Sequence, residues 1–384
     1  MDRHASLTPH NGPTAWIGSD IRADSRWRFS LDDAALVEID TAIAAVRERE
    51  LPWERVGSED FVVPRLSGLL ERVGRELEDG CGMARLEGLP VDRYPEVDLR
   101  RLLFGLGSHL GTPLFQTARG ELMGVIADEG GDVGKHRGQV RDPETGKMFL
   151  SSRSRAQSTA QLRWHTDRCD VVGLLCINTA RAGGVSRLAS AVTVSNVMLA
   201  RRPDLAALLY ADIPRSRLGE ERGGEHCHYL LPVFAECDGK FTSHYSRTFV
   251  EAAQKDARAP RMTDTQWEAL DLLASIADEV GFEMELRPGD LQFLNNHVIY
   301  HGRTPFEDFE QPERKRRLLR IWLSAHGSRA LPDGFDVLWG QTSAGALRGG
   351  MCQSALPGDG LQWSFAQADE RVPKWFLEQN SERG

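Results

Sequence analysis

One short apolar run limits the folds open to this chain more than any other feature. Residues 171–177, Val-Val-Gly-Leu-Leu-Cys-Ile, contain no polar side chain and have the length of a strand rather than of a helix. A strand that is apolar in both side-chain directions must be covered on both faces. The sequence therefore predicts a layered architecture in which this strand lies inside a sheet that is packed on either side.

The order of the other predicted elements indicates what those layers are. Amphipathic helices are predicted after an N-cap near Ser30 and over residues 64–77 and 98–110, with a strand-like segment at 82–88. From about Gly120 the chain changes to short strands and loops. Further strands are predicted near residues 229–235, 241–245, 282–286, 291–294 and 318–324. One helix interrupts these strands, with Thr263 as its N-cap and Val280 near its end.

This order favours a mainly β fold, a double-sheet roll flanked by helices. We expect a single catalytic domain over residues 1–384, with an N-terminal arm and helices over 1–80 and a core over 81–330 that includes the helical insertion near 263–280. Residues 331–384 form a C-terminal extension in this interpretation. The first thirty residues are rich in Gly, Pro, Ser and Asp, and we expect an irregular arm there.

Charge and composition exclude several kinds of partner. The formal net charge is −9, and the densest basic run, residues 313–320, is too short for a nucleic-acid-binding face. No apolar stretch approaches the roughly 20 residues of a membrane span, and the first residues lack the apolar core of a signal peptide. The six cysteines form no CxxC pair, which is the usage expected in a reducing compartment. The sequence therefore predicts a cytoplasmic protein without nucleic-acid or membrane partners.

The segment Leu-Arg-Trp-His-Thr-Asp, residues 162–167, contains the first candidate metal ligands. Residues i and i+2 of a strand point to the same face with Cα atoms about 6.6 Å apart, so His165 and Asp167 can reach one ion. The best candidate for a third ligand lies in residues 289–306, which include His297 and His301. Two histidines and one carboxylate form the facial triad of non-haem Fe(II) oxygenases, which leaves positions open for a cosubstrate and O₂. The His-x-Asp pair alone is a weak signal, because a buried histidine more often bonds a backbone carbonyl.

Four segments in a fixed order strengthen the metal interpretation. They are Trp-His-Thr-Asp at 164–167, Gly-Gly-Val-Ser at 183–186, Gly-Asp at 289–290 leading to His-Gly-Arg-Thr-Pro at 301–305, and Arg-Arg-Leu-Leu-Arg at 316–320. In this order they resemble the taurine dioxygenase/TfdA-like family of Fe(II)/2-oxoglutarate dioxygenases. The resemblance implies a double-stranded β-helix (jelly-roll, cupin-like) core, one Fe(II), 2-oxoglutarate as cosubstrate, and O₂. It also places the third ligand in the His-Gly-Arg-Thr-Pro segment, so that His301 rather than His297 completes the triad with His165 and Asp167.

The resemblance also implies ligands for 2-oxoglutarate, whose distal carboxylate needs a cation. Arginine suits this role because its fork holds a carboxylate with two hydrogen bonds. By resemblance Arg316 is this ligand and Arg320 is the second arginine of the pair. On one strand the two share a face, with Cα atoms about 13 Å apart, whereas Arg317 should face away. The alternative is that all three are solvated members of a basic run.

A serine stands where the family has a threonine. The family's Gly-Gly-x-Thr supplies a hydroxyl to the same carboxylate, and this chain has Ser186 at that position. Serine keeps the donor but loses the methyl group that restricts the rotamer, so we expect the hydroxyl to keep its role. Gly183 and Gly184 are expected to form a turn and not a phosphate-binding loop.

Other polar residues have competing interpretations. The segment His226-Cys-His228, with His244 nearby, suggests a second metal site, but it has no matched pair at a zinc spacing and lies in a Gly-rich loop. We therefore expect substrate-lid or surface residues there. We expect Cys169 to be a small packing residue, and Asp170 to support a metal ligand or to be solvated.

The resemblance implies oxidation of an aliphatic C–H bond of a small molecule, with release of succinate and CO₂. Hydroxylation is the default outcome, and desaturation or ring formation starts from the same radical. Asp167 disfavours halogenation, because a halogenase needs that position for halide. The substrate loops are expected over residues 114–163 and 215–228. The first of them indicates an anionic substrate, because it contains Arg137, Arg141, Arg153, Arg155 and Arg163.

Two other functions fit parts of the pattern. A catalytically silent jelly-roll binding or sensing module has no need of an intact triad and Arg316. A metal-dependent hydrolase would use the same three ligands, but it has no need of the arginine pair and Ser186. The oligomeric state cannot be read from the sequence, and a homo-oligomer is an expectation only because relatives of this kind often self-associate.

Overall fold

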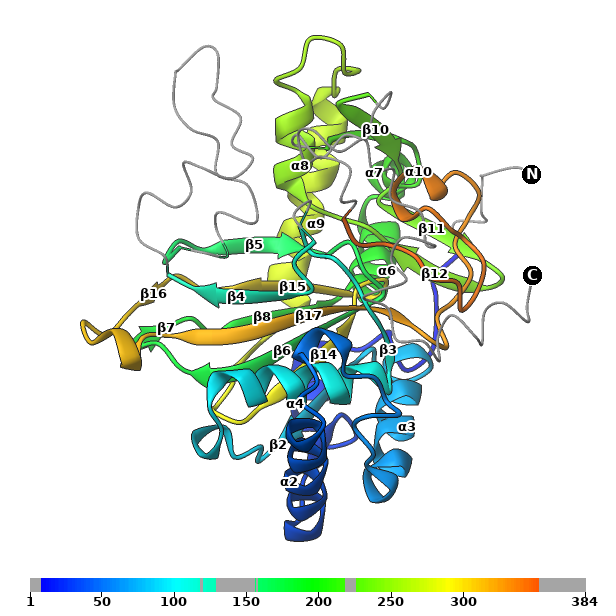
Figure 1. The fold of residues 1–384 in the computed structure, drawn as a ribbon. Helices are drawn as coiled ribbons and strands as arrows, with labels where there is room; N and C mark the ends of the chain where they lie inside the picture. The colour runs from blue at the N-terminus through cyan, green and yellow to red at the C-terminus, as the bar shows by residue number, and fades with distance from the viewer. Residues whose placement is uncertain (1–7, 118–119, 129–155, 157, 218–225, 352–384) are drawn as a thin grey trace.

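The computed structural model describes residues 8–117, 120–128, 156, 158–217 and 226–351, and its core is built from two facing β-sheets (Figure 1). The larger sheet contains, in spatial order, β1 (Arg28–Ser30), β2 (Met83–Glu87), β14 (Leu291–Asn295), β6 (Val171–Asn178), β17 (Arg317–Ala325) and β3 (Gly111–Pro113), and β4 (Met123–Ala127) also pairs with β17. The smaller sheet contains β13 (Phe282–Met284), β8 (Ser186–Ser190), β15 (Ile299–Arg303) and β5 (Leu162–His165). This is the mainly β architecture with flanking helices that the sequence predicts.

Three two-stranded ribbons extend these sheets. They are β7 (Ala182–Gly183) with β16 (Phe306–Glu307), β9 (Ile213–Ser216) with β10 (His228–Leu231), and β11 (Phe234–Cys237) with β12 (Lys240–Ser243). The strand predicted over residues 229–235 is therefore wrong as a single element, because the chain leaves β10 at Leu231 and starts a new ribbon at Phe234. The break falls at Pro232, which has no backbone N–H to donate to a ladder.

Strand β6 is buried on both faces, as predicted. Val171 and Leu175 belong to the core cluster under the N-terminal helices, whereas Val172 and Cys176 belong to the cluster shared with the smaller sheet. Figure 1 shows the helices α2 (Asp33–Glu48), α3 (Pro64–Glu78) and α4 (Glu96–Ser108) on the outer side of the larger sheet. The larger sheet is therefore covered on both faces, by these helices on one side and by the smaller sheet on the other.

Helices also cover the outer side of the smaller sheet. The helix α9 (Asp264–Val280) packs against α6 (Ala191–Arg201), α7 (Pro203–Leu209) and β8. Thr263 caps α9 as predicted, and with Gln266 it forms a reciprocal capping box. Outside the N-terminal segment, the other helices of the described residues are α8 (Arg247–Ala253), α10 (Asp336–Trp339) and the 3₁₀ turns Trp53–Arg55, Val91–Arg93 and Pro312–Arg314.

The N-terminal segment is more ordered than predicted. Instead of an irregular arm, it contains helix α1 (Gly18–Ala23), and β1 pairs in parallel with β2. Two buried indoles hold it, because Trp16 donates to the carbonyl of Cys81 and Trp27 donates to that of Ile21. The N-cap of α2 is Asp32, not Ser30, since the Asp32 carboxylate accepts from the Ala35 N–H.

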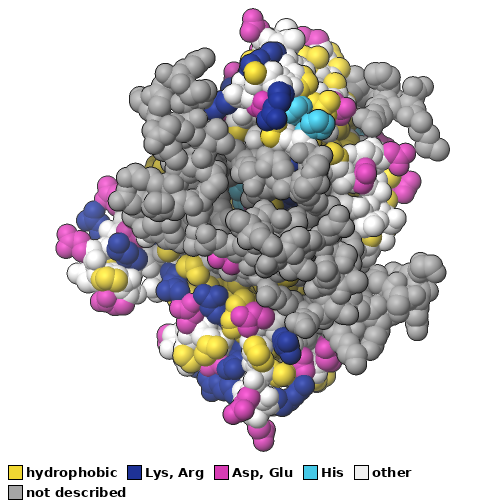
Figure 2. All heavy atoms as spheres, turned by 45° about the horizontal axis from the view of Figure 1, so that its top comes forward, with side chains coloured by type: hydrophobic (Ala, Val, Ile, Leu, Met, Phe, Trp, Pro, Cys, Tyr) yellow, Lys and Arg dark blue, Asp and Glu magenta, His cyan; other side chains and the backbone are white. Residues whose placement is uncertain are grey.

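On the face drawn in Figure 2, acidic and basic side chains of the described residues lie interspersed, without a broad basic patch. Among the described residues, no helix combines the length and the apolar character that crossing a bilayer requires.

The turn that enters β14 supports a stability prediction. Gly289 has φ +88°, and a Cβ there would lie 2.2 Å from the Leu89 carbonyl oxygen. We expect Gly289→Ala to lower the free energy of unfolding by about 2 kcal/mol or more. Gly68 is the matched control, because it lies exposed in α3 and a Cβ there would have no atom within 4 Å. Gly68→Ala should raise stability by roughly 0.5–1 kcal/mol. Urea unfolding midpoints measure both, and a Gly289→Ala midpoint at or above wild type would contradict this expectation.

Candidate metal centre

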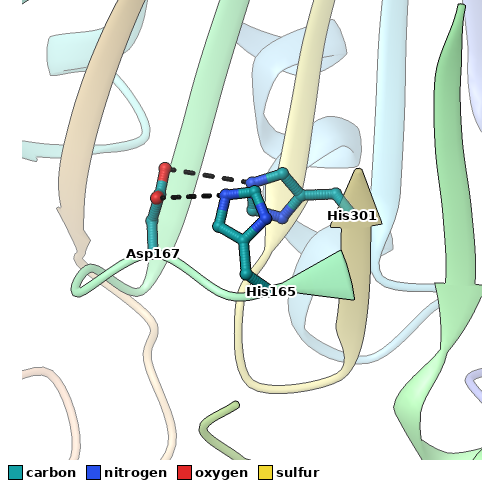
Figure 3. Close-up of side chains that lie close together, drawn as sticks. All are labelled: His165, Asp167 and His301. Carbon is teal, nitrogen blue, oxygen red and sulfur yellow. Dashed lines mark ion pairs between the residues drawn. The ribbon is translucent and has the colours of Figure 1, made fainter. Parts of the chain in front are cut away.

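The three predicted metal ligands come together between the two sheets. His165 is the last residue of β5 and lies directly opposite His301 of β15 in the antiparallel register. Asp167 follows two residues after His165, where the chain leaves the strand. Figure 3 shows the two imidazoles side by side with the carboxylate facing both of them. Strand pairing therefore explains how residues more than a hundred positions apart in the sequence meet.

The ligand atoms face one another at distances close to those around a bound ion. The Nε2 atom of His165 is 3.7 Å from Oδ1 of Asp167, and Nε2 of His301 is 3.9 Å from Oδ2. All three side chains are buried, and one ligand atom from each lies within 4.8 Å of the others. Ligands about 2.1 Å from one ion are roughly 3 Å apart when they are neighbours, so small side-chain rotations would close the set. The donor set fits Fe(II), with one face of the ion left open.

Hydrogen bonding orients one of the two histidines for this role. The Nδ1 atom of His165 lies 2.9 Å from the carbonyl oxygen of Arg163. Donation from Nδ1 to that carbonyl leaves the lone pair on Nε2, the atom that faces Asp167. His301 has no such partner on Nδ1 among the described residues, so packing in the strand sets its orientation.

Electrostatics favour neutral imidazoles beside a charged carboxylate. Burial lowers the pKa of His165 and, together with the neighbouring His165 ring, lowers the pKa of His301 to about 3. Burial by itself would raise the pKa of Asp167, but Arg320 and the two histidines outweigh it and hold that pKa below its usual range. At neutral pH the cluster therefore already has the protonation state that a divalent cation requires.

Two residues that the sequence interpretation missed fix Asp167. The indole Nε1 of Trp322 donates to Asp167 Oδ2 over 2.8 Å, and the Asp167 backbone N–H donates to Oδ1 of Asn296 over 2.9 Å. Strand alternation could have indicated Trp322, because it lies two residues after Arg320 on β17 and therefore points to the same face of the sheet. No local pattern indicates Asn296, which lies in the turn between β14 and β15.

Arg316 is a buried cation with unused hydrogen-bonding capacity. It precedes β17, is only 6% exposed, and has its guanidinium 5.3 Å from the centre of the Phe306 ring. Its Nη1 has no hydrogen-bond partner among the described residues, and burial lowers its pKa to about 10. The nearby Asp308 only partly offsets this desolvation, and its carboxylate accepts from the Arg316 backbone N–H, so the open Nη1 of the guanidinium fits a site for a carboxylate ligand.

The Gly-Gly-Val-Ser segment lies next to this arginine. Gly183 and Gly184 have φ values of +72° and +70°, which agrees with the predicted turn. A Cβ on Gly184 would lie 3.1 Å from Arg316 Nε, so the glycine permits the close approach. Ser186 follows at the start of β8, where it is buried. Arg316 therefore lies against the short segment that leads to Ser186, the other residue predicted at the distal carboxylate.

The other two arginines of the basic run point in different directions. Arg320 donates from Nε to Oε1 of Gln116 over 2.8 Å, and its Nη1 is 3.6 Å from Asp167 Oδ2. Arg320 therefore lies beside the metal ligands. Arg317 instead pairs with Glu96 of α4 on the opposite face of the sheet, as its parity predicts.

His297 and Asp170 belong to a separate buried network. His297 lies in the turn before β15 and does not belong to the cluster of His165, Asp167 and His301. Its Nε2 is 2.7 Å from Asp170 Oδ1, and its Nδ1 is 2.8 Å from the Thr242 hydroxyl. Asp170 also accepts from Arg348 Nε over 2.8 Å, and the expectation that Asp170 could be solvated is wrong because both side chains are fully enclosed. Cys169 is buried next to it, as expected.

A second cluster of potential ligands lies outside this centre. Cys227, His228 and Asp256 are partly exposed, and one ligand atom from each lies within 4.8 Å of the others. Asp256 was not part of the sequence interpretation. Arg258 already pairs with the Asp256 carboxylate over 3.0 Å. His244 does not join this cluster, because it is buried with its Nδ1 3.1 Å from the Thr166 hydroxyl.

The predicted substrate loops are described only in part. Arg137, Arg141, Arg153 and Arg155 lie outside the described residues. Arg163 forms an ion pair with Glu251 over 2.7 Å, so its charge is already balanced.

Comparison with known proteins independently supports the family resemblance seen in the sequence. The family model described as "Taurine catabolism dioxygenase TauD, TfdA family" matches residues 48–322. Among curated proteins, FR-33289 synthase of Streptomyces rubellomurinus is 28% identical over 344 residues, which cover 88% of this chain and 96% of that protein. The taurine hydroxylase-like protein SAT17 of Stachybotrys chartarum is 27% identical over 328 residues, which cover 84% and 82% of the two chains.

Solved structures with the same fold include iron oxygenases. An asparagine oxygenase in complex with Fe(II), a 3-hydroxyasparagine and succinate superposes with a TM-score of 0.57 at 18% identity, covering 78% of this chain and 93% of the other. The non-haem iron oxygenase OrfP in complex with Fe and α-ketoglutaric acid gives a TM-score of 0.53 at 17% identity, covering 77% and 94%. At these identities the likeness establishes the double-stranded β-helix fold.

Proposed function

The chain belongs to the TauD/TfdA family of taurine catabolism dioxygenases, and on that premise we propose that it oxidises an aliphatic C–H bond of an anionic small molecule. It is an Fe(II)- and 2-oxoglutarate-dependent dioxygenase. In the proposal His165, Asp167 and His301 hold the iron, Arg316 and Ser186 hold the distal carboxylate of 2-oxoglutarate, and Arg320 is the second arginine of the cosubstrate site.

The convergence of the triad with a buried, incompletely bonded arginine is the observation that carries the proposal. A metal-dependent hydrolase needs the triad, but it has no use for the desolvated Arg316 beside Ser186 and the two glycines. A silent binding module needs neither feature. When bound, iron with 2-oxoglutarate and O₂ supplies the oxidising chemistry. The residues of the chain position these groups and exclude water from the space between the sheets.

Hydroxylation is the proposed outcome, and its support comes from relatives. Hydroxylated asparagine and hydroxylated arginine are ligands in the similar structures of asparagine oxygenase and OrfP. A curated relative is named a taurine hydroxylase-like protein. The anionic character of the substrate is supported by the number of arginines in the loop over residues 114–163. The proposal keeps a cytoplasmic location, which fits the absence of disulfide bonds at Cys81, Cys169, Cys176 and Cys237 among the described residues.

A product assay tests the outcome. The enzyme is supplied with Fe(II), 2-oxoglutarate, O₂ and one of three probes: taurine, L-asparagine or L-arginine. We expect succinate formation to depend on both Fe(II) and 2-oxoglutarate, and a probe that is turned over to gain the mass of one oxygen atom. A product that loses two hydrogens instead would replace hydroxylation by desaturation or cyclisation. Hydrolysis of a probe without consumption of 2-oxoglutarate would overturn the proposal. The family resemblance also predicts self-association, and sedimentation measures it separately.

A further inference from the structure

The environment of Asp167 is asymmetric at its two carboxylate oxygens. Oδ2 accepts the indole N–H of Trp322 over 2.8 Å and also lies 3.6 Å from Arg320 Nη1. Oδ1 has no hydrogen bond among the described residues, and His165 Nε2 lies 3.7 Å from it. Oδ2 also faces Nε2 of His301 at 3.9 Å, so each oxygen faces one histidine, but only Oδ2 accepts a hydrogen bond from the described residues.

The hydrogen-bond donor Trp322 and the ion-pair partner Arg320 at Oδ2 are both held in place by their surroundings. Trp322 is 4% exposed and packs in the cluster between the sheets, so its ring has little freedom to turn away. Gln116 fixes Arg320 from both sides, because it accepts from Nε of Arg320 over 2.8 Å and donates to the Arg320 carbonyl over 2.7 Å. Residues of β17 and of the segment that follows β3 thus fix the groups that contact Oδ2.

This difference between the two oxygens matters because it decides how many positions on the ion stay open. A six-coordinate ion with two histidines and a one-oxygen carboxylate keeps three positions, two for the 2-oxo acid end of 2-oxoglutarate and one for O₂. A carboxylate that binds through both oxygens would occupy the third position. We infer that Trp322 is a positioning residue, whose indole N–H holds Oδ2 of Asp167 so that the carboxylate binds iron through Oδ1 alone. This inference rests on the proposed role of Asp167 as a metal ligand.

Removal of the N–H donor tests the inference, and two variants remove it in different ways. Trp322→Phe deletes the donor with part of the ring. Replacement of Trp322 by β-(3-benzothienyl)alanine exchanges only the N–H for sulfur and keeps the bicyclic shape, so it separates the donor from the packing. Trp16→Phe is the matched control, because Trp16 is also buried, at 7% exposure, and its Nε1 donates to the Cys81 carbonyl far from the ligands in sequence.

The first readout is Fe(II) binding to the apo-protein, measured without oxygen and without cosubstrate. We expect both Trp322 variants to bind Fe(II) at least about tenfold more weakly, since loss of a hydrogen bond to a metal ligand typically costs 10–100-fold in affinity. The second readout is the visible charge-transfer band of the anaerobic Fe(II)–2-oxoglutarate complex. It should move to longer wavelength, because a carboxylate without the hydrogen bond donates more electron density to iron. A role in packing alone would not move this band.

Each outcome decides the inference. The inference would be overturned if the benzothienyl variant had the Fe(II) affinity and the band position of wild type. It would also be overturned if Trp16→Phe lost as much Fe(II) affinity as the Trp322 variants. The failure of the proposed function is a different result, because wild-type protein that binds no Fe(II) would refute the metal site itself. Wild-type binding with an unaffected benzothienyl variant would refute only the role of Trp322.

Discussion

Replacement of His165 or Asp167 by alanine should abolish turnover and weaken Fe(II) binding by more than 100-fold. Each change removes a group that contacts the ion in the proposed site, whereas loss of a supporting hydrogen bond already costs 10–100-fold. The two remaining ligands would lie on one side of the ion and would hold it poorly. Succinate formation and anaerobic equilibrium dialysis with Fe(II) measure the two effects.

His228→Ala provides the control for this result. His228 belongs to the other ligand cluster, with Cys227 and Asp256, and not to the cluster between the sheets. We expect this variant to bind Fe(II) with the affinity of wild type. Turnover at the wild-type rate in either His165→Ala or Asp167→Ala would refute the ligand assignment. Loss of Fe(II) binding only in His228→Ala would move the iron to the second cluster.

The second large effect concerns Arg316. Arg316→Met should raise the KM for 2-oxoglutarate roughly 100-fold, because truncation of one partner of a buried charged pair costs 2–5 kcal/mol. Arg317→Met should change this KM little, since Arg317 pairs with Glu96 on the opposite face of the sheet. Equal effects of the two substitutions would contradict the strand parity, and a larger effect of Arg317→Met would assign the carboxylate of the cosubstrate to Arg317 instead.

A stability measurement separates this role from a structural one. The guanidinium of Arg316 is buried with Nη1 unbonded among the described residues, so the side chain costs desolvation energy unless a ligand binds it. We expect the thermal midpoint of apo Arg316→Met to equal or exceed that of apo wild type. Added 2-oxoglutarate with Fe(II) should then stabilise wild type but not the variant, because a ligand stabilises only the protein that binds it. A large drop in the midpoint of the apo variant would instead assign Arg316 to the packing of the core.

The predictions from sequence succeeded where the signal is local and periodic. Strand β6 was recognisable from its apolar run, and α9 was recognisable from Thr263 and the helical spacing that follows it. The opposite orientations of Arg316 and Arg317 follow from strand alternation alone. The order of four short segments indicated which histidine lies opposite His165, although no spacing rule distinguishes His301 from His297.

The predictions failed where contacts join distant parts of the chain. Asp170 was expected near a metal ligand or in solvent, but it is enclosed by His297 and by Arg348, which lies 178 positions further along. Such a pair leaves no trace in local composition. The N-terminal segment was assigned as irregular because its composition is rich in loop formers. Tertiary contacts of Trp16 and Trp27 override that composition, which a propensity argument cannot detect.

The neighbours of Asp167 illustrate the same limit inside the site. The sequence pattern predicts Asp167 as a ligand but not the groups that orient it, because Trp322 and Asn296 come from other strands and turns. Once the pairing of β17 and β6 is known, the position of Trp322 follows from its parity with Arg320. The residues of the proposed metal site could therefore be predicted from the sequence, whereas the contacts that orient them became known only from the structure.

One anaerobic spectrum tests the central claim most directly. Fe(II) and 2-oxoglutarate are added to the apo-protein without oxygen, and the visible absorption is recorded for wild type and for His165→Ala. We predict a weak charge-transfer band that requires both additions and is absent in His165→Ala, as expected for 2-oxoglutarate chelated to iron in this site. Absence of the band in wild type, with tight binding of Zn(II) instead, would contradict the proposed function and favour a hydrolase. Absence of both the band and metal binding would leave a catalytically silent jelly-roll module.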